Sequence, residues 1–292
     1  MMSRFSALAA ISLPLLACAA SGASPAPDRA AGSPLPTSVV AQAPVPAPEA
    51  KPSAFDAIHG PWSAILAKHV RGGDFDYATL AKERAGLDAY VAALEAVNPD
   101  AFAALTPKER FAFWINAYNA YTVKRVVDGY PVKSIRDLGD EKTSVWDRDF
   151  VPLGRLFPKL AKDKLTLNDI ENKILRPTFQ DARLHAAVNC ASKGCPALRA
   201  EAFTSAKLDA QLDEQVKRWL ADTTRNRLDR AKSSIEVSKV FEWFAEDFQR
   251  EAGSARAWIA RFRPEDKDWL DAQKKVEVKF VEYDWALNGV QP

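Results

Sequence analysis

Two cysteines and a histidine lie close together in the segment between residues 183 and 196. Cys195 follows Cys190 after four intervening residues, and His185 precedes Cys190 by five positions. A thiolate is a strong nucleophile and a soft metal ligand, and an imidazole can act as a base near neutral pH. The segment therefore predicts a disulfide, a thiol active site or a metal site.

The disulfide alternative follows from spacing and compartment. Four intervening residues let the chain fold back so that Cys190 and Cys195 can pair, and an oxidising compartment would favour the bond. In the zinc alternative, Cys190, Cys195, His185 and Glu171 would be the ligands. Their spacing lacks the paired short intervals of common structural zinc sites, so no metal and no cofactor is predicted.

In the third alternative, Cys190 is the nucleophile and His185 is its base. A regular helix or strand would point these two side chains apart, so a direct pair requires a bend between them, for which residues 188–189 are a suitable place. Asn116, Asn119, Glu171 and Asp247 are the candidates for orienting His185. Glu171 and Asp247 have a simpler alternative as solvated or structurally paired carboxylates.

Asn116 and Asn119 belong to a predicted core helix. Thr106-Pro107-Lys108-Glu109 has the pattern of a helix start, aromatic residues follow at helical spacing, and the helix should end near Gly129. A buried amide without partners would cost about 1 to 3 kcal/mol. The two asparagines must therefore either tie down a neighbouring loop or orient a catalytic side chain.

The remaining periodicity predicts an α+β fold, a helix-rich single domain with a small, mainly antiparallel sheet. Helices are expected over 87–97, over 166–175 with a stop at Pro177, over 208–219, and after a capping Ser238. Alternating residues predict a strand at 235–237 and strand pairing with a bulge over 276–285. If Cys190 is a nucleophile, the architecture would be similar, by analogy, to papain or transglutaminase.

The first 24 residues have the layout of a secretory signal peptide, with Arg4, a short apolar run and then small residues. Leu15-Leu16-Ala17-Cys18 indicates a lipoprotein signal with acylation at Cys18, although ordinary cleavage near the same place would release a soluble protein. Residues 25–54 are rich in proline and alanine and are typical of a disordered tether. All eight tryptophans lie in the remaining part, 55–292, which is the predicted globular domain.

Charge and hydropathy limit which kinds of molecule the protein is expected to bind. The net charge is +2, with no basic run among aromatic residues, which argues against nucleic acid. After the first 24 residues no segment has the length of a transmembrane span, so we expect membrane attachment through the lipid anchor only, at the periplasmic or outer-membrane face.

Several short motifs occur along this chain in the same order as in one known protein family. These are Asp76-Tyr77, Phe113-Trp114-Ile115-Asn116-x-Tyr118-Asn119-Ala120, Leu167-x-x-Asp169-Ile170-Glu171, the His185 to Pro196 segment, Trp243-Phe244-x-x-Asp247-Phe248, and Tyr283-Asp284-Trp285-x-Leu287-Asn288. Over roughly residues 60 to 290 the chain resembles the domain of unknown function 547 family.

The resemblance implies a family without an agreed activity. Many relatives have histidine after the Ile-Glu pair, where this chain has Asn172. Relatives also occur in reducing cytoplasm, which implies that a disulfide is not the only purpose of the cysteine motif. Our hypothesis is a cysteine-dependent hydrolase or acyl or peptidyl transferase, acting on a peptide or envelope substrate. The alternative is a non-catalytic, lipid-anchored binding or structural module with a Cys190–Cys195 disulfide.

Overall fold

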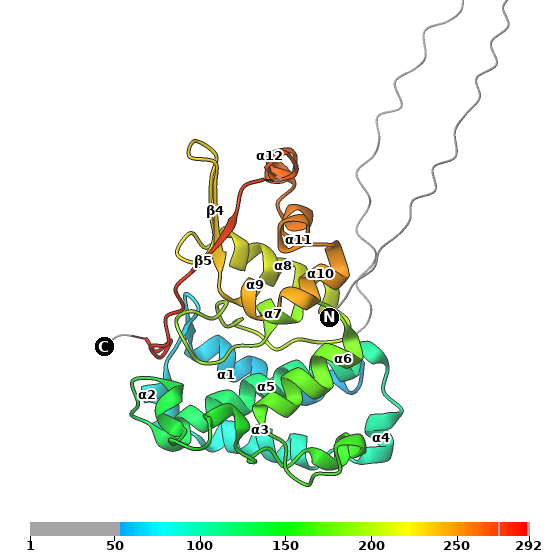
Figure 1. Ribbon diagram of the computed structural model, residues 1–292. Helices are drawn as coiled ribbons and strands as arrows, with labels where there is room; N and C mark the ends of the chain where they lie inside the picture. Colours follow the sequence, from blue (N-terminus) through cyan, green and yellow to red (C-terminus); the bar gives the residue numbers. More distant parts are fainter. Residues whose placement is uncertain (1–52, 274, 291–292) are drawn as a thin grey trace, which may run out of the picture. The chain divides into compact units, whose positions relative to one another are not determined.

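The computed structural model describes residues 53–273 and 275–290, which fall within one compact unit, Pro48–Pro292. The predicted signal peptide with Cys18 lies outside the described residues, as does the predicted tether except for its last two residues. The helices are η1 (Asp56–His59), α1 (Gly60–His69), α2 (Tyr77–Lys82), α3 (Ala85–Glu95), α4 (Pro99–Ala103), α5 (Pro107–Gly129), η2 (Ile135–Leu138), η3 (Val145–Asp147), η4 (Gly154–Leu156), η5 (Pro158–Leu160), η6 (Asp169–Leu175), α6 (Arg176–Phe179), α7 (Leu184–Ala187), α8 (Leu208–Ala221), α9 (Val240–Trp243), α10 (Ala245–Ala252), α11 (Ala255–Phe262), η7 (Pro264–Asp266) and α12 (Lys267–Ala272). The strands are β1 (Val70–Arg71), β2 (Asp74–Phe75), β3 (Arg227–Asp229), β4 (Ser234–Ser238) and β5 (Val278–Val281) (Figure 1). In this described part, no helix has both the length and the apolar character needed to cross a membrane.

Helix α5 is the centre of the first hydrophobic core. It begins with the predicted capping box between Thr106 and Glu109 and ends at Gly129, as predicted. Every residue from Phe111 to Val123 is buried. A helix that is buried on all sides must be surrounded by other elements. Helices α2 and α3 pack against α5, and Figure 1 shows α1 to α6 gathered around it in the lower half of the view.

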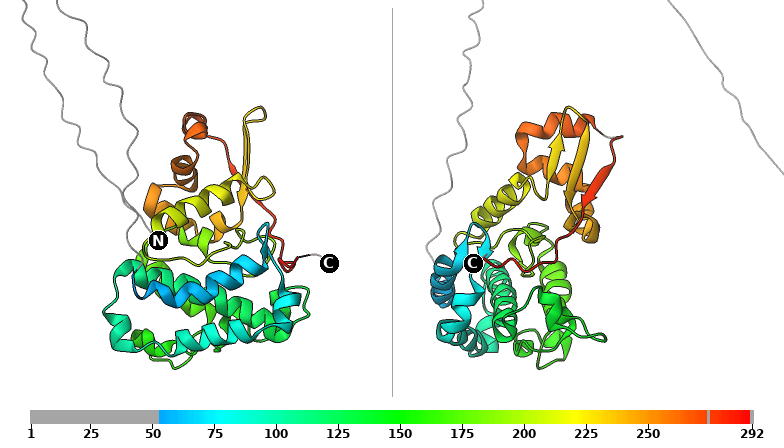
Figure 2. Two further views of the ribbon diagram at one scale, coloured as in Figure 1. Left: turned by 180° about the vertical axis from the view of Figure 1, so that it is seen from behind. Right: turned by 90° about the vertical axis from the view of Figure 1, so that its left-hand side faces the viewer.

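A second hydrophobic core lies between the three-stranded sheet and α8 to α12. Its largest buried side chains are Trp219, Phe241 and Trp258. Both views in Figure 2 place these helices and the sheet on the same side of the α1 to α6 layer. The short helix α7 joins the two cores, because Leu184 and Ala187 pack in the first and Ala186 packs in the second.

The chain is an α+β domain that is richer in helix than in strand, as the sequence predicts. Strands β1 and β2 are antiparallel, and β3 and β4 are antiparallel, but β5 lies parallel to β4. Of the strand pairing expected over 276–285, the structure contains only the strand β5. After Val281 the chain leaves the sheet, and residues 284–288 hydrogen-bond to the loop that holds the cysteines.

The helix expected over 166–175 ends at Leu175 as η6, but α6 continues the helical chain beyond it. Pro177 does not stop the helical segment, because it lies in the first turn of α6, where a proline needs no backbone N–H. The preceding segment, η6, is a π-helix and carries Glu171. Single π-helical turns occur often at functional sites.

Candidate functional site

A cavity of about 160 Å³ lies where the two cores meet. A large part of its wall is aromatic, formed by Tyr118, Trp146, Trp243, Phe244, Tyr283 and Trp285. The polar and sulfur-containing part of the wall includes Glu171, His185, Cys190 and Cys195. A mostly apolar pocket with a few polar groups is the usual form of a ligand site. Four of the residues singled out from the sequence therefore line one cavity.

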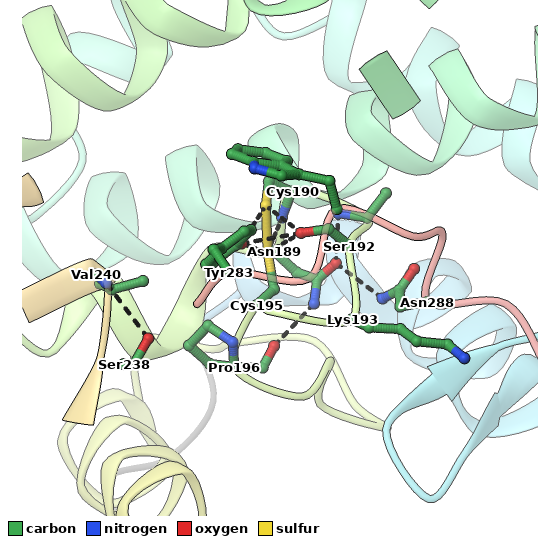
Figure 3. The surroundings of a disulfide bond; sticks show 12 residues. Asn189, Cys190, Ser192, Lys193, Cys195, Pro196, Ser238, Val240, Tyr283 and Asn288 are labelled. Atoms are coloured by element: carbon green, nitrogen blue, oxygen red, sulfur yellow. Dashed lines mark hydrogen bonds between the residues drawn. A yellow bond between two sulfur atoms is a disulfide. The ribbon is translucent and has the colours of Figure 1, made fainter. Parts of the chain in front are cut away.

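Cys190 and Cys195 are joined by a disulfide, with their Cα atoms 6.3 Å apart (Figure 3). Of the three sequence alternatives for this pair, the structure contains the disulfide. Ala191 has a φ of 61°, in the left-handed region, and this turn lets the chain fold back on itself. Among the described residues, no three histidine, cysteine or acidic side chains are grouped as metal ligands would be.

The two sulfurs differ in exposure but share hydroxyl partners. Cys190 is half-buried, whereas Cys195 is buried. The hydroxyl of Tyr283 lies 3.0 Å from Sγ of Cys190 and 3.1 Å from Sγ of Cys195, and Figure 3 shows its ring beside the bond. The hydroxyl of Ser192 lies 3.1 Å from Sγ of Cys190. Burial raises the pKa of Tyr283, so its phenol stays neutral and can donate a hydrogen bond.

Asn119 fixes the start of the cysteine loop. Its side chain donates to the carbonyl of Ala187 at 2.9 Å and accepts from the N–H of Asn189 at 2.8 Å. Asn189 in turn accepts from the N–H of Ala191 and donates to the carbonyl of Pro196. Because these groups are buried, the loop is held by satisfied amides and does not depend on the disulfide alone.

Asn116 holds a different segment. Its amide donates to the carbonyl of Phe203 at 2.8 Å and its oxygen accepts from the N–H of Phe203 at 3.0 Å. Neither Asn116 nor Asn119 is among the residues that line the cavity. Both asparagines therefore hold neighbouring loops, which is one of the two alternatives expected from the sequence. The side chain that is hydrogen-bonded to His185 is instead that of Asp247.

Asp247 accepts a hydrogen bond from Nε2 of His185 at 2.8 Å. It also accepts from Arg176 at 2.6 Å and from Arg250 at 2.8 Å. Burial acts to raise the pKa of Asp247, but these hydrogen bonds outweigh it and lower the pKa, so the carboxylate is ionised and Nε2 carries the proton.

The other nitrogen of His185, Nδ1, is buried and has no hydrogen-bond partner among the described residues. Burial lowers the pKa of His185, which opposes the effect of Asp247, so the imidazole is neutral and Nδ1 has a free lone pair. The ring stacks on Phe244 with 4.1 Å between centroids. No hydrogen bond among the described residues joins His185 to Cys190.

Glu171 is the second titratable group of the cavity wall. Burial raises its pKa to about 7, although a hydrogen bond with Tyr118 and the charge of Arg176 act in the opposite direction. A carboxyl group with this pKa is partly protonated at neutral pH. Asn172, which follows Glu171, accepts a hydrogen bond from Arg176 at 2.9 Å.

The part of the chain that matches a known family contains several residues of this site. Residues 102–220 match DUF547, a family of proteins of unknown function. Searches of curated proteins and of solved structures gave no match. The papain-like or transglutaminase-like architecture therefore stays a prediction.

The DUF547 match contains Glu171, His185, Cys190 and Cys195, but it ends before two residues that complete the site. Asp247 was one of four sequence candidates for orienting His185, and it has the hydrogen bond to that ring, whereas Tyr283 was not selected from the sequence as a partner of the sulfurs. Both lie in aromatic motifs, Trp243-Phe244-x-x-Asp247 and Tyr283-Asp284-Trp285, and these motifs were the available signal. Tyr283 is positioned because the N–H groups of Lys193 and Gly194 donate to the carbonyls of Ala286 and Asp284.

Proposed function

We propose that the cavity is the active site of a cysteine-dependent hydrolase or acyl transferase, which works when the disulfide is reduced. Cys190 is the nucleophile, His185 is the base and Asp247 positions His185. The observation that carries the proposal is the shared cavity. It brings the half-buried Cys190 together with an imidazole whose Nδ1 has no partner within the described part of the chain. The buried His59 and His69 also have one ring nitrogen without a partner among the described residues, so what distinguishes His185 is its place in the cavity wall and its bond to the ionised Asp247.

The reaction follows from these atoms. The thiol proton of Cys190 passes to Nδ1 of His185 while the sulfur attacks the substrate carbonyl. Collapse of the tetrahedral intermediate gives a thioester and releases the leaving group, which takes the proton from His185. Water then forms the acid, or an amine forms an amide, and Cys190 becomes a thiol again. This step requires the side chain of Cys190 to rotate toward His185 once the bond to Cys195 is open.

Three further groups support charge and proton movement. The hydroxyls of Tyr283 and Ser192 lie within 3.1 Å of Sγ of Cys190, where they can donate to an oxyanion that forms beside the sulfur. Glu171, with a pKa of about 7, is partly protonated at neutral pH and can donate a hydrogen bond to the leaving group, which takes its proton from His185. The aromatic wall would hold the apolar part of an acyl or peptide substrate.

The experiment is acylation of the Cys195→Ser variant, in which Cys190 is a permanent thiol. We expect p-nitrophenyl esters or thioesters to add one acyl group at Cys190, detected by intact mass and peptide mapping. His185→Gln should slow acylation by about 10²-fold or more. Glu246→Gln, an exposed change on α10, is the control that should leave the rate unchanged. Equal acylation of folded Cys195→Ser and of its His185→Gln double variant would reject His185 as the base.

A non-catalytic binding module is the second candidate, and the exposed end of the aromatic wall favours it. Trp243 is 44% exposed and packs against Tyr283 and Trp285, with ring centroids 4.7 and 5.7 Å apart. This candidate predicts that a peptide or cell-wall fragment binds equally well to wild type and to Cys190→Ser. Absence of any acyl adduct on the folded Cys195→Ser variant, together with such binding, would favour this candidate over the enzyme.

We also infer that the chain is exported and anchored by a lipid at Cys18, as its first residues predict. Labelling of cells with a fatty-acid analogue should mark the wild type but not Cys18→Ala. Fractionation should then move the unlabelled variant out of the membrane fraction. Equal labelling of both proteins would contradict the anchor.

A further inference from the structure

We propose that the Cys190–Cys195 bond is an exchange site, which an external thiol opens by attack on Cys190 with Cys195 as the leaving group. The partner class is a dithiol, either a small molecule or the active site of a reducing protein. The proposal concerns the same cavity but does not depend on acyl transfer, because it needs only the two sulfurs and their surroundings.

The first argument is the direction of access. Thiol–disulfide exchange requires the attacking sulfur to reach one of the two bonded sulfurs. Cys190 is half-buried and lines the aromatic cavity, whereas Cys195 is only 4% exposed. Cys195 also borders a second, polar cavity of about 220 Å³ near Arg218 and Arg225, which is the competing route of entry. The difference in exposure favours attack on Cys190.

The second argument is the stabilisation of the leaving group. The backbone N–H of Cys190 donates to Sγ of Cys195 at 2.9 Å, and no such backbone donor reaches Sγ of Cys190 in the described residues. The hydroxyls of Tyr283 and Ser192 lie 3.1 and 3.5 Å from the sulfur of Cys195 but 3.0 and 3.1 Å from that of Cys190, so the backbone N–H is the donor that distinguishes Cys195. Donors of this kind stabilise a thiolate, and a more stable thiolate leaves faster.

The third argument is that the loop keeps its shape without the bond. The N–H of Cys195 donates to the carbonyl of Ser192, and the side chain of Asn189 joins Ala191 to Pro196 across the loop. The C-terminal segment adds hydrogen bonds to Lys193 and Gly194. The two thiols would therefore stay close after reduction, so the bond could form again.

The reaction is balanced. One thiolate of the dithiol attacks Sγ of Cys190, a mixed disulfide forms and Cys195 leaves as a thiolate. The second thiol of the partner then attacks its own sulfur in the mixed disulfide and releases Cys190. Two electrons and two protons pass to the protein, and the partner becomes a disulfide. Reoxidation runs the same steps in reverse with a partner disulfide.

The test treats the oxidised domain with reduced glutathione at native conditions and traps the products by rapid alkylation. Peptide mapping should find glutathione on Cys190 and the alkyl group on Cys195, in at least about tenfold excess over the reverse pattern. Circular dichroism checks that the domain is folded. Equal amounts of the two patterns, or an excess of glutathione on Cys195, would overturn the proposed direction of attack.

A second measurement uses the intact pair. Dithiothreitol should open the bond in the folded wild type, and Tyr283→Phe should shift the equilibrium toward the disulfide by about tenfold, because one hydrogen bond to the thiolate is lost. Tyr130→Phe, at an exposed tyrosine, is the matched control. A bond that opens only when the wild type is unfolded would refute the proposal, whatever the result of the acylation experiment.

Discussion

The most informative single substitution is Glu171→Gln, because it removes a charge that the cavity does not favour. Glu171 is 8% exposed, and burial raises its pKa from 4.5 to about 7. Glutamine has nearly the same shape and can keep the contact with Tyr118. The change therefore separates the cost of the buried charge from the packing of the side chain.

The sign and size of the change in the free energy of unfolding follow from the pKa of Glu171 in the unfolded and folded states. Below pH 4.5 the carboxyl is protonated in the folded and unfolded states, so it contributes nothing to the pH dependence of stability. Between 4.5 and about 7 the unfolded chain ionises first, and the free energy of unfolding of the wild type falls. The difference between these two pKa values corresponds to about 3 kcal/mol of unfolding free energy. Glu171→Gln should match the wild type near pH 4 and exceed it by about 3 kcal/mol at pH 8.

The assay is urea unfolding at several pH values, followed by tryptophan fluorescence with the disulfide intact. Glu246→Gln, on the exposed face of α10, is the control, and its difference from the wild type should not change with pH. A Glu171→Gln difference that is constant from pH 4 to pH 8 would refute the raised pKa. A variant that is less stable than the wild type at pH 8 would show that the carboxylate has a partner which outweighs its burial.

Two further substitutions test how the cysteine loop is held. Asn119→Ala should lower the free energy of unfolding by about 2 to 4 kcal/mol and speed alkylation of the reduced cysteines, because two buried backbone groups lose their partner. Asn116→Ala should lower the free energy of unfolding in urea by the same amount without changing the rate of alkylation. Gly194→Ala would place a Cβ 2.8 Å from the ring of Tyr283, so it should displace the ring and shift the thiol–disulfide equilibrium in glutathione buffers as Tyr283→Phe does. Gly289→Ala, whose Cβ meets its nearest neighbour at 3.6 Å, should leave that equilibrium unchanged.

Elements with local signals were predictable from the sequence. The capping box and aromatic spacing of α5 lie within the helix itself, and the helix has the predicted start and end. The parallel pairing of β4 with β5 was not predictable in this way. It joins Ile235 to Val278, and nothing in either strand specifies the direction of its partner.

The candidate site was predictable only in part, for the same reason. Cys190 and Cys195 are neighbours in the sequence, so their pairing could be proposed from spacing. The contact of His185 with Asp247 spans 62 positions, and that of Cys190 with Tyr283 spans 93. Contacts of this range depend on how the two cores pack together, and the sequence motifs indicated only that these residues matter.

Stabilisation alone is a weak explanation for the disulfide. The bond closes a loop with a sequence separation of 5, and a loop this short removes only about 2 kcal/mol of unfolded-state entropy. Asn119, Asn189 and the C-terminal segment already hold the loop through hydrogen bonds. A bridge selected for stability would be expected to join distant segments and to be buried. This one places a half-buried sulfur in a cavity that also contains an imidazole with an unpartnered nitrogen and a carboxyl with a pKa of about 7. Perturbed titratable groups that meet in a cavity are more typical of chemistry than of structural support.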